Sequence, residues 1–196
     1  MTHWSQPSMT GFKPQLSRRC FLKSGVILAA TCLTPHVTLA RPPQDRSQVA
    51  EKVLAFHNTH TGENLTTVYW AQGDYVGEAI SDINHILRDH RANEIKSMDL
   101  DLLDFLHTIQ QKLGSRESFH VFSGYRTPAT NALLRRRSKR VSKQSLHMQG
   151  KAVDISLPGY DTQTVRRAAI SLNRGGVGYY PSSNFIHVDT GPVRSW

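Results

Sequence analysis

Two histidines and one aspartate in this chain have the types and the spacing that could hold a metal ion. Six residues separate His147 from Asp154 in the stretch Ser-Leu-His-Met-Gln-Gly-Lys-Ala-Val-Asp, and His187 follows much later in Asn-Phe-Ile-His-Val-Asp. A catalytic zinc needs three such protein ligands and an open position for a water whose proton the metal makes easier to lose. The sequence therefore predicts a zinc hydrolase with His147, Asp154 and His187 as its ligands.

The surroundings of Asp154 favour the same interpretation. Residues 152–155, Ala-Val-Asp-Ile, are typical of a buried strand, and residues 144–151 are expected to form the loop that brings His147 to the site. A buried carboxylate is costly unless it is paired or bound to a cation. A metal ion would supply that cation.

Two further residues could act on a substrate or on the ligands. Arg126 follows an expected strand at residues 118–122, where its planar fork could reach a carboxylate or a carbonyl oxygen. Asp189 is expected to share one strand face with His187, because side chains alternate along a strand. It could orient the histidine as a hydrogen-bonded carboxylate, or act as a general base.

The elements expected to position these residues have clear sequence signals. Residues 53–56 and 65–70 are rich in β-formers around a turn, and residues 177–180 and 185–189 predict a second hairpin. The expected helices are residues 77–91, a helix capped by Asp99 and ended by Gly114, one capped by Thr127, and one capped by Asp161.

The first forty residues have the features of an export signal rather than of a folded domain. Ser17-Arg18-Arg19 precedes an apolar run at residues 25–33 and the small-residue ending at Ala40, which predicts a twin-arginine signal cleaved after Ala40. The apolar run is too short to span a bilayer, so we expect no stable membrane anchor after cleavage. Residues 41–48 are expected to be a short linker and residues 49–196 the domain that carries the candidate zinc site, located in the periplasm.

The charge of the mature part favours an anionic partner. Four of the 24 basic residues but none of the 15 acidic ones precede residue 41, which leaves a net charge of +5. A mildly basic exported protein is attracted to an anionic envelope polymer, whereas export separates it from nucleic acid. The run of basic residues at 135–143 is interpreted first as a solvated helix end, and second as an electrostatic guide toward such a polymer.

Three motifs in order carry a resemblance to a known family. They are Ser-x-Tyr-Arg at residues 123–126, Ser-x-His-x-x-Gly-x-Ala-x-Asp at residues 145–154, and the late His187. They resemble the D-Ala-D-Ala carboxypeptidase and hedgehog-type zinc peptidases, and the ending Gly-Gly-Val-Gly-Tyr-Tyr-Pro…His-Val-Asp-Thr-Gly is similar to the branch with murein endopeptidase K-type cell-wall hydrolases. The resemblance implies a small α+β domain with an antiparallel sheet and flanking helices, which binds Zn²⁺ and cuts the peptide cross-links of peptidoglycan.

One position departs from the pattern of this superfamily. Many relatives carry an Asp or Glu three residues before the final zinc histidine as general base, but Asn184 occupies that place here and cannot take a proton. Asp189 is the nearest carboxylate in sequence and is assigned the role of base as a hypothesis. Arg126 is expected to hold a substrate carboxylate or the developing oxyanion.

Two alternatives remain open from the sequence. The first is a carboxypeptidase that trims stem peptides, since Arg126 could bind either a free carboxylate or an internal carbonyl. The second is a peptidoglycan-binding module without activity. The intact ligand set disfavours this alternative, but Asn184 in the place of the general base is compatible with it. A monomer is expected in either case.

Overall fold

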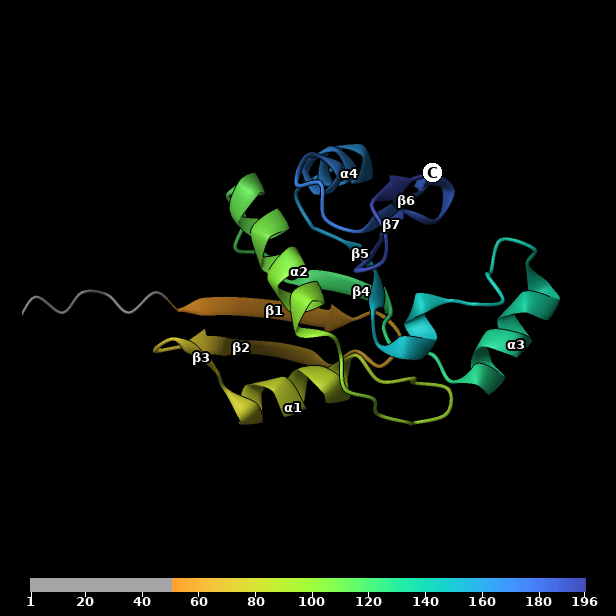
Figure 1. The fold of residues 1–196 in the computed structure, drawn as a ribbon, viewed down its shortest axis with the longest axis horizontal. Coiled ribbons are helices and arrows are strands. Elements are labelled where there is room, and N and C mark those ends of the chain that lie inside the picture. Colours follow the sequence, from red (N-terminus) through yellow and green to blue (C-terminus); the bar gives the residue numbers. More distant parts are fainter. Residues whose placement is uncertain (1–50) are drawn as a thin grey trace, which may run out of the picture. The chain divides into compact units, whose positions relative to one another are not determined.

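The computed structural model describes residues 51–196, which form an α+β fold of helices packed on one sheet (Figure 1). The predicted fold class is confirmed. The predicted export signal (1–40) and linker (41–48) lie outside the described residues. The elements are β1 (Lys52–Asn58), β2 (Asn64–Ala71), β3 (Asp74–Tyr75), α1 (Gly77–Ile86), α2 (Leu100–Leu113), β4 (Phe119–Ser123), α3 (Pro128–Arg137), the 3₁₀ turn η1 (Leu146–Gln149), β5 (Ala152–Ser156), α4 (Thr162–Ser171), β6 (Gly176–Tyr180), the 3₁₀ turn η2 (Pro181–Ser183), β7 (Phe185–Asp189) and β8 (Arg194–Ser195).

The sheet is mixed rather than purely antiparallel. Its strands lie in the order β3-β2-β1-β4-β5-β7-β6-β8. Both predicted hairpins, β1–β2 and β6–β7, are confirmed as antiparallel pairs, but β1 pairs with β4 and β6 pairs with β8 in parallel. The expectation of an antiparallel sheet is therefore wrong at these two pairs. Between β2 and β4 the chain passes through α1 and α2, and such a crossover allows β4 to return parallel to β1.

The core lies between one face of the sheet and the helices. The apolar stripe of α2 faces this core: Leu102, Leu106 and Ile109 are fully buried, and Leu113 at its end is half-buried against the core. Alternate residues of the strands meet it, and those with no exposed surface include Leu54, Phe56, Phe119, Ile155, Ile186 and Val188. The remaining strand positions alternate onto the opposite face, which is where Asp154 and His187 lie.

Side-chain caps fix the beginning of three helices as predicted. The carboxylate of Asp99 accepts from the backbone N–H of Asp101, the hydroxyl of Thr127 accepts from Thr130, and Asp161 accepts from Thr164. Gly114 ends α2 in the left-handed conformation, also as predicted. These caps determine where each helix starts relative to the preceding strand or loop.

The first helix ends earlier than its hydrophobic pattern suggested. The sequence predicts a helix over residues 77–91, but α1 ends at Ile86. The carboxylate of Asp89 is buried and accepts from the backbone N–H groups of Arg91 and Ala92, which closes a local turn. An aspartate that bonds the backbone two residues ahead competes with helical hydrogen bonding.

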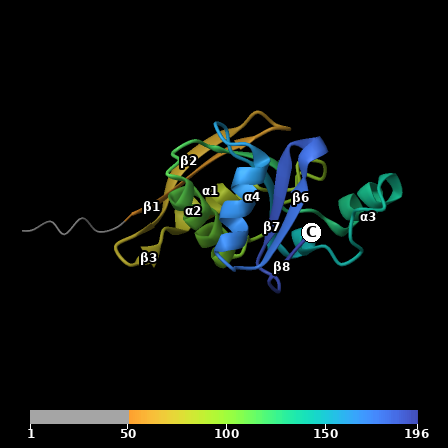
Figure 2. The same ribbon diagram turned by 90° about the horizontal axis from the view of Figure 1, so that it is seen from above.

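The third helix stands apart from the rest of the domain. In two perpendicular views α3 projects at one edge of the domain (Figures 1 and 2). Within residues 51–196, no helix has the length and apolar character needed to cross a membrane.

Candidate metal centre

Strand pairing and one 3₁₀ turn bring the three predicted ligands together. Asp154 of β5 lies directly opposite His187 of β7 in the antiparallel ladder. His147 lies on η1, which ends at Gly150 in the left-handed conformation that returns the chain into β5. All three residues are buried.

The ligand atoms of these residues form a small triangle. His147 Nε2 lies 3.1 Å from His187 Nδ1 and 3.3 Å from Asp154 Oδ1, and His187 Nδ1 lies 2.9 Å from Asp154 Oδ1. Ligands at about 2.0–2.1 Å from a tetrahedral zinc are separated by about 3.3 Å. The triangle has the size of one face of such a tetrahedron, so the residues fit a single metal ion.

The outward-facing nitrogen of each histidine is held by a hydrogen bond. His147 Nδ1 donates to the carbonyl oxygen of Gly124 at 2.7 Å, and His187 Nε2 donates to Asp189 Oδ2 at 2.9 Å. With a metal ion in place of the proton between His187 Nδ1 and Asp154, the lone pairs of His147 Nε2 and His187 Nδ1 would face the centre of the triangle. Partners of this kind fix the tautomer and the ring orientation of metal-binding histidines.

Asp189 has both of its oxygens occupied by donors. Oδ1 accepts from the backbone N–H groups of Gly176 and Gly191, and Arg194 donates to Oδ1 at 3.1 Å and to Oδ2 at 2.6 Å. The residue has no exposed surface. Of the two roles predicted for Asp189, this geometry favours orientation of His187 over proton transfer as a general base.

Arg126 contacts Asp154 as well as the cavity. Its Nη2 donates to Asp154 Oδ2 at 3.0 Å, on the oxygen opposite the histidines, and its Nε donates to Ser123 Oγ at 3.1 Å. Arg126 also lines the cavity in front of the site. One guanidinium thus fixes the carboxylate of Asp154 and faces the cavity.

The protonation equilibria show a site that stabilises positive charge. Burial lowers the pKa of His147. Burial opposes charge on His187 too, but its hydrogen bonds to Asp154 and Asp189 outweigh this effect and raise its pKa to about 9. Burial alone would raise the pKa of Asp154, yet His147 and His187 hold it well below its usual range. A metal cation would provide the same compensation for Asp154 that a proton on His187 provides.

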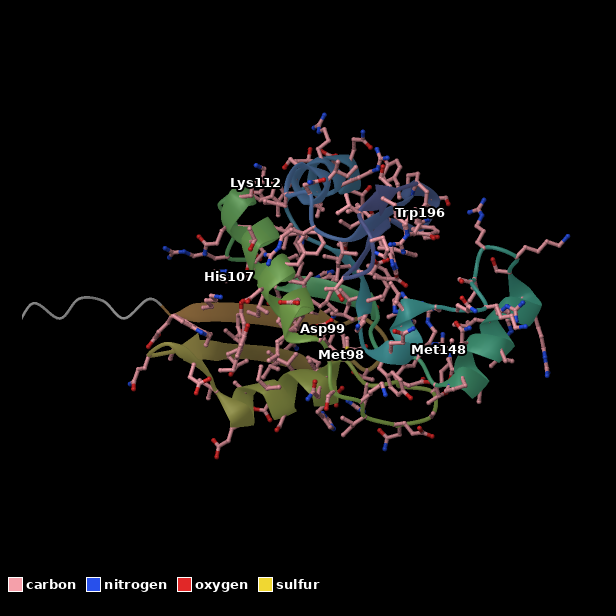
Figure 3. All side chains as sticks on the ribbon, viewed as in Figure 1. Met98, Asp99, His107, Lys112, Met148 and Trp196 are labelled. Atoms are coloured by element: carbon pink, nitrogen blue, oxygen red, sulfur yellow. The ribbon has the colours of Figure 1, made fainter. Side chains whose placement is uncertain are left out.

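A cavity of about 550 Å³ opens over the triangle. Trp196 lies at its wall with its ring 5.4 Å from that of His187, and its Nε1 donates to the hydroxyl of Tyr180. The indole lies against Gly178, where a Cβ would come within 2.7 Å of it. Figure 3 shows Trp196 and Met148 of η1 on the part of the domain nearest to α3.

The sequence predicted the three residues of the triangle, Arg126 and Asp189. It did not predict three groups that the structure places around them. These are Arg194, Trp196 and the carbonyl of Gly124. Arg194 and Trp196 follow Asp189 by five and seven residues, and an arginine so close to a buried carboxylate was a usable signal. A backbone carbonyl has no signal in the sequence, because every residue carries one.

Fold and site together indicate a class of protein, α+β domains with a buried His-Asp-His group that could hold one metal ion. Comparison with known families narrows this class: the chain belongs to the family described as peptidoglycan L,D-endopeptidase MepK, which matches residues 46–196.

Curated relatives agree with this membership. Peptidoglycan L,D-endopeptidase MepK of Escherichia coli (strain K12) is 42% identical over 180 residues, covering 91% of this chain and 96% of the relative. The protein of the same name from Shigella flexneri has the same identity and coverage. Probable peptidoglycan L,D-endopeptidase MepK of Haemophilus influenzae is 39% identical over 181 residues, covering 92% of this chain and 95% of the relative.

Proposed function

We propose that the protein is a zinc-dependent peptidoglycan endopeptidase that hydrolyses L,D cross-links between stem peptides. The observation that carries the proposal is the buried triangle of His147, Asp154 and His187, with edges of 2.9 to 3.3 Å. Membership of the endopeptidase family and the names of the relatives supply the substrate class.

His147, Asp154 and His187 are the proposed ligands. Two imidazoles and one carboxylate are a donor set suited to zinc, which favours nitrogen and oxygen ligands in tetrahedral geometry. When bound, the ion supplies Lewis acidity, which polarises a carbonyl oxygen and makes water a stronger acid. The fixed tautomers of His147 and His187 keep the donor atoms ready for it.

The other polar residues orient the ligands and the substrate. Asp189, fixed by Arg194, holds His187 by its Nε2–H. Arg126 holds Asp154 and faces the cavity, where its positive charge stabilises negative charge that develops on the substrate carbonyl oxygen. An interaction of that kind contributes on the order of 3 kcal/mol when it strengthens in the transition state.

Asn184 has no direct part in this arrangement. It is exposed at the end of η2 in a left-handed conformation, while its neighbours Ser183 and Phe185 line the cavity. The absence of a carboxylate at position 184 therefore leaves the ligand set and its hydrogen-bonded partners intact.

The route to the substrate is also part of the proposal. Peptidoglycan lies outside the cytoplasmic membrane, and the paired arginines at the start of the chain fit export by the twin-arginine pathway. We expect residues 49–196 to act in the periplasm as a monomer after cleavage at Ala40. The net charge of +5 suits an anionic polymer as substrate.

Mass spectrometry of defined cross-linked muropeptide dimers tests the proposed function. The purified mature protein is incubated with L,D- and D,D-cross-linked dimers, with zinc and with chelator. Zinc-dependent conversion of L,D dimers to monomers is expected, with the fragment masses naming the bond. Release of a terminal D-amino acid without cleavage of the dimers would instead establish a carboxypeptidase.

Two variants make the test specific. His147→Ala removes a ligand and is expected to lose both stoichiometric zinc and activity. His85→Ala changes an exposed histidine of α1 outside the cavity and is expected to keep both. Full activity in zinc-free His147→Ala would overturn the ligand assignment.

A further inference from the structure

One part of the described chain combines isolation from the core with high positive charge. We define the basic arm as residues 128–144, which comprise α3 and the segment that returns to η1. The arm projects at one edge of the domain in both perpendicular views (Figures 1 and 2). It is fixed at its base, where Thr127 donates to the buried carboxylate of Asp89, and across its width, where Asn131 Nδ2 donates to the carbonyl oxygen of Ser142.

The basic arm has no acidic residue, and its cations are exposed. No Asp or Glu occurs between Glu117 and Asp154. The six cations of the arm are Arg135, Arg136, Arg137, Lys139, Arg140 and Lys143. Within residues 51–196, none of them forms a salt bridge, although seven salt bridges occur elsewhere in this part of the chain.

The end of a helix explains only part of this charge. Arg135, Arg136 and Arg137 occupy the last turn of α3, where cations complement the helix dipole. Lys139, Arg140 and Lys143 lie beyond the last turn, where this effect has faded. The interpretation of the run as a solvated helix end therefore leaves half of the charge without a reason.

The returning segment of the arm forms a wall of the catalytic cavity. The cavity that contains His147, Asp154 and His187 is also lined by residues of the arm, namely Ser138, Arg140, Val141, Ser142 and Gln144. Arg140 thus joins an open basic surface to the candidate metal centre. A ligand that enters the cavity passes beside this surface.

We propose that the basic arm binds the free carboxylates of the peptide stem next to the bond that is cut, with Arg140 as its cation at the cavity wall. This inference rests on the proposed function. Peptidoglycan stem peptides carry carboxylates that take no part in the cross-link. Their negative charge is complementary to the positive charge of the six arm cations, which form no salt bridge within the described residues. A surface of one sign beside a cavity raises the local concentration of an oppositely charged substrate and accelerates its association.

The test compares two forms of one L,D-cross-linked dimer, one with free carboxylates and one with the same groups converted to carboxamides. Arg140→Gln and the triple variant Arg135→Gln/Arg136→Gln/Arg137→Gln are measured against Lys112→Gln. Lys112 is an exposed cation on α2, well separated from α3 in Figure 3. kcat/KM is determined at several salt concentrations, with zinc content and thermal unfolding as checks on the fold.

We expect Arg140→Gln to lower kcat/KM for the carboxylate substrate by about twofold to fivefold, the size of an exposed ion pair. The triple variant is expected to lower it by a similar factor and to make its dependence on salt shallower. Both variants should act on the carboxamide substrate like the parent, and Lys112→Gln should equal the parent on both substrates.

The outcomes separate the two proposals. If the parent cleaves neither substrate, the proposed function fails. If the parent is active and the arm variants match it, the arm has no part in binding. Equal losses on the carboxylate and carboxamide substrates, or an equal loss in Lys112→Gln, would overturn the assignment of the arm to substrate carboxylates.

Discussion

At the scale of single residues, Asp189 has the contacts of an orienting group. It is fully buried, accepts a hydrogen bond from His187 Nε2, and is fixed by Arg194 and two backbone N–H groups. A general base must be able to reach the proton that it removes. A carboxylate with both oxygens bonded to other donors is poorly placed for that task.

The variant Asp189→Asn distinguishes the two roles. If Asp189 orients His187, zinc affinity should fall by about 10- to 100-fold, because partners of ligand histidines contribute this much. Much of the lost activity should then return when zinc is raised to saturation. Zinc affinity is measured by competition with a chromogenic chelator, and kcat is measured on muropeptide dimers at saturating zinc.

Arg194→Gln provides the matched comparison, because it changes the partner of Asp189 and leaves the carboxylate in place. It should shift zinc affinity in the same direction by a smaller factor, since Gly176 and Gly191 still hold Asp189. Unchanged zinc affinity in Asp189→Asn together with a lasting loss of kcat would identify Asp189 as the base after all.

Most residues of the candidate site could be predicted from the sequence, because their types are unusual for the local segments in which they occur. A histidine in a glycine-containing loop and an aspartate in an apolar strand are both typical of a metal site. The contact of Arg194 with Asp189 depends on how the chain turns after β7, and the contact of His147 with the carbonyl of Gly124 depends on tertiary packing. Neither follows from residue type.

At the scale of elements, the start of α3 depends on one buried carboxylate from a distant segment. Asp89 Oδ2 accepts from both the backbone N–H and the hydroxyl of Thr127, the N-cap of α3, at 2.9 Å. Burial alone would raise the pKa of Asp89, but hydrogen bonds from Thr130, Thr127 and Arg91 outweigh burial and lower it. Asp89 is therefore more stable as a carboxylate in the folded state than in the unfolded state.

This contact predicts a dependence of stability on pH. A carboxyl group with a lowered folded pKa stabilises the fold above its unfolded pKa of about 3.9, and this contribution is lost as pH falls through the folded pKa. Asp89→Asn should lower the free energy of unfolding at pH 7 by about 1–3 kcal/mol, because an amide replaces a charged acceptor. The difference between parent and variant should shrink as pH falls below about 4.

Urea unfolding of the metal-free protein over a series of pH values measures this difference. Asp82→Asn, an exposed change on α1, serves as the control and should follow the parent throughout. A constant difference between Asp89→Asn and the parent at every pH would contradict the ionic origin of the effect and leave only lost packing.

The elements that could be predicted are those with local signals. Caps at Asp99, Thr127 and Asp161 and the alternation along both hairpins are properties of short segments, and the structure confirms them. The parallel pairing of β1 with β4 joins segments separated by two helices. Local patterns do not specify which distant strand becomes a neighbour, so the mixed sheet could not be predicted from them.

At the scale of the whole molecule, the candidate metal centre joins segments that are far apart in the chain. Its proposed ligands come from η1, β5 and β7, and the carbonyl of Gly124 after β4 holds one of them. Two histidines and an aspartate converge there at 2.9 to 3.3 Å in a buried place. A bound cation should therefore stabilise the folded state, because unfolding separates all of its ligands.

Thermal unfolding of the mature protein tests this coupling. A ligand that binds only the folded state adds about 2.7 kcal/mol when its free concentration is 100 times its Kd, and for a domain of this size each kcal/mol raises Tm by about 2–4 °C. We expect zinc to raise Tm by about 5–10 °C over the chelator-treated protein, with further rises as zinc is increased. His147→Ala should show no such rise. An unchanged Tm of the parent protein on addition of zinc would contradict a metal centre. An equal rise in the Tm of His147→Ala would show that zinc binds elsewhere.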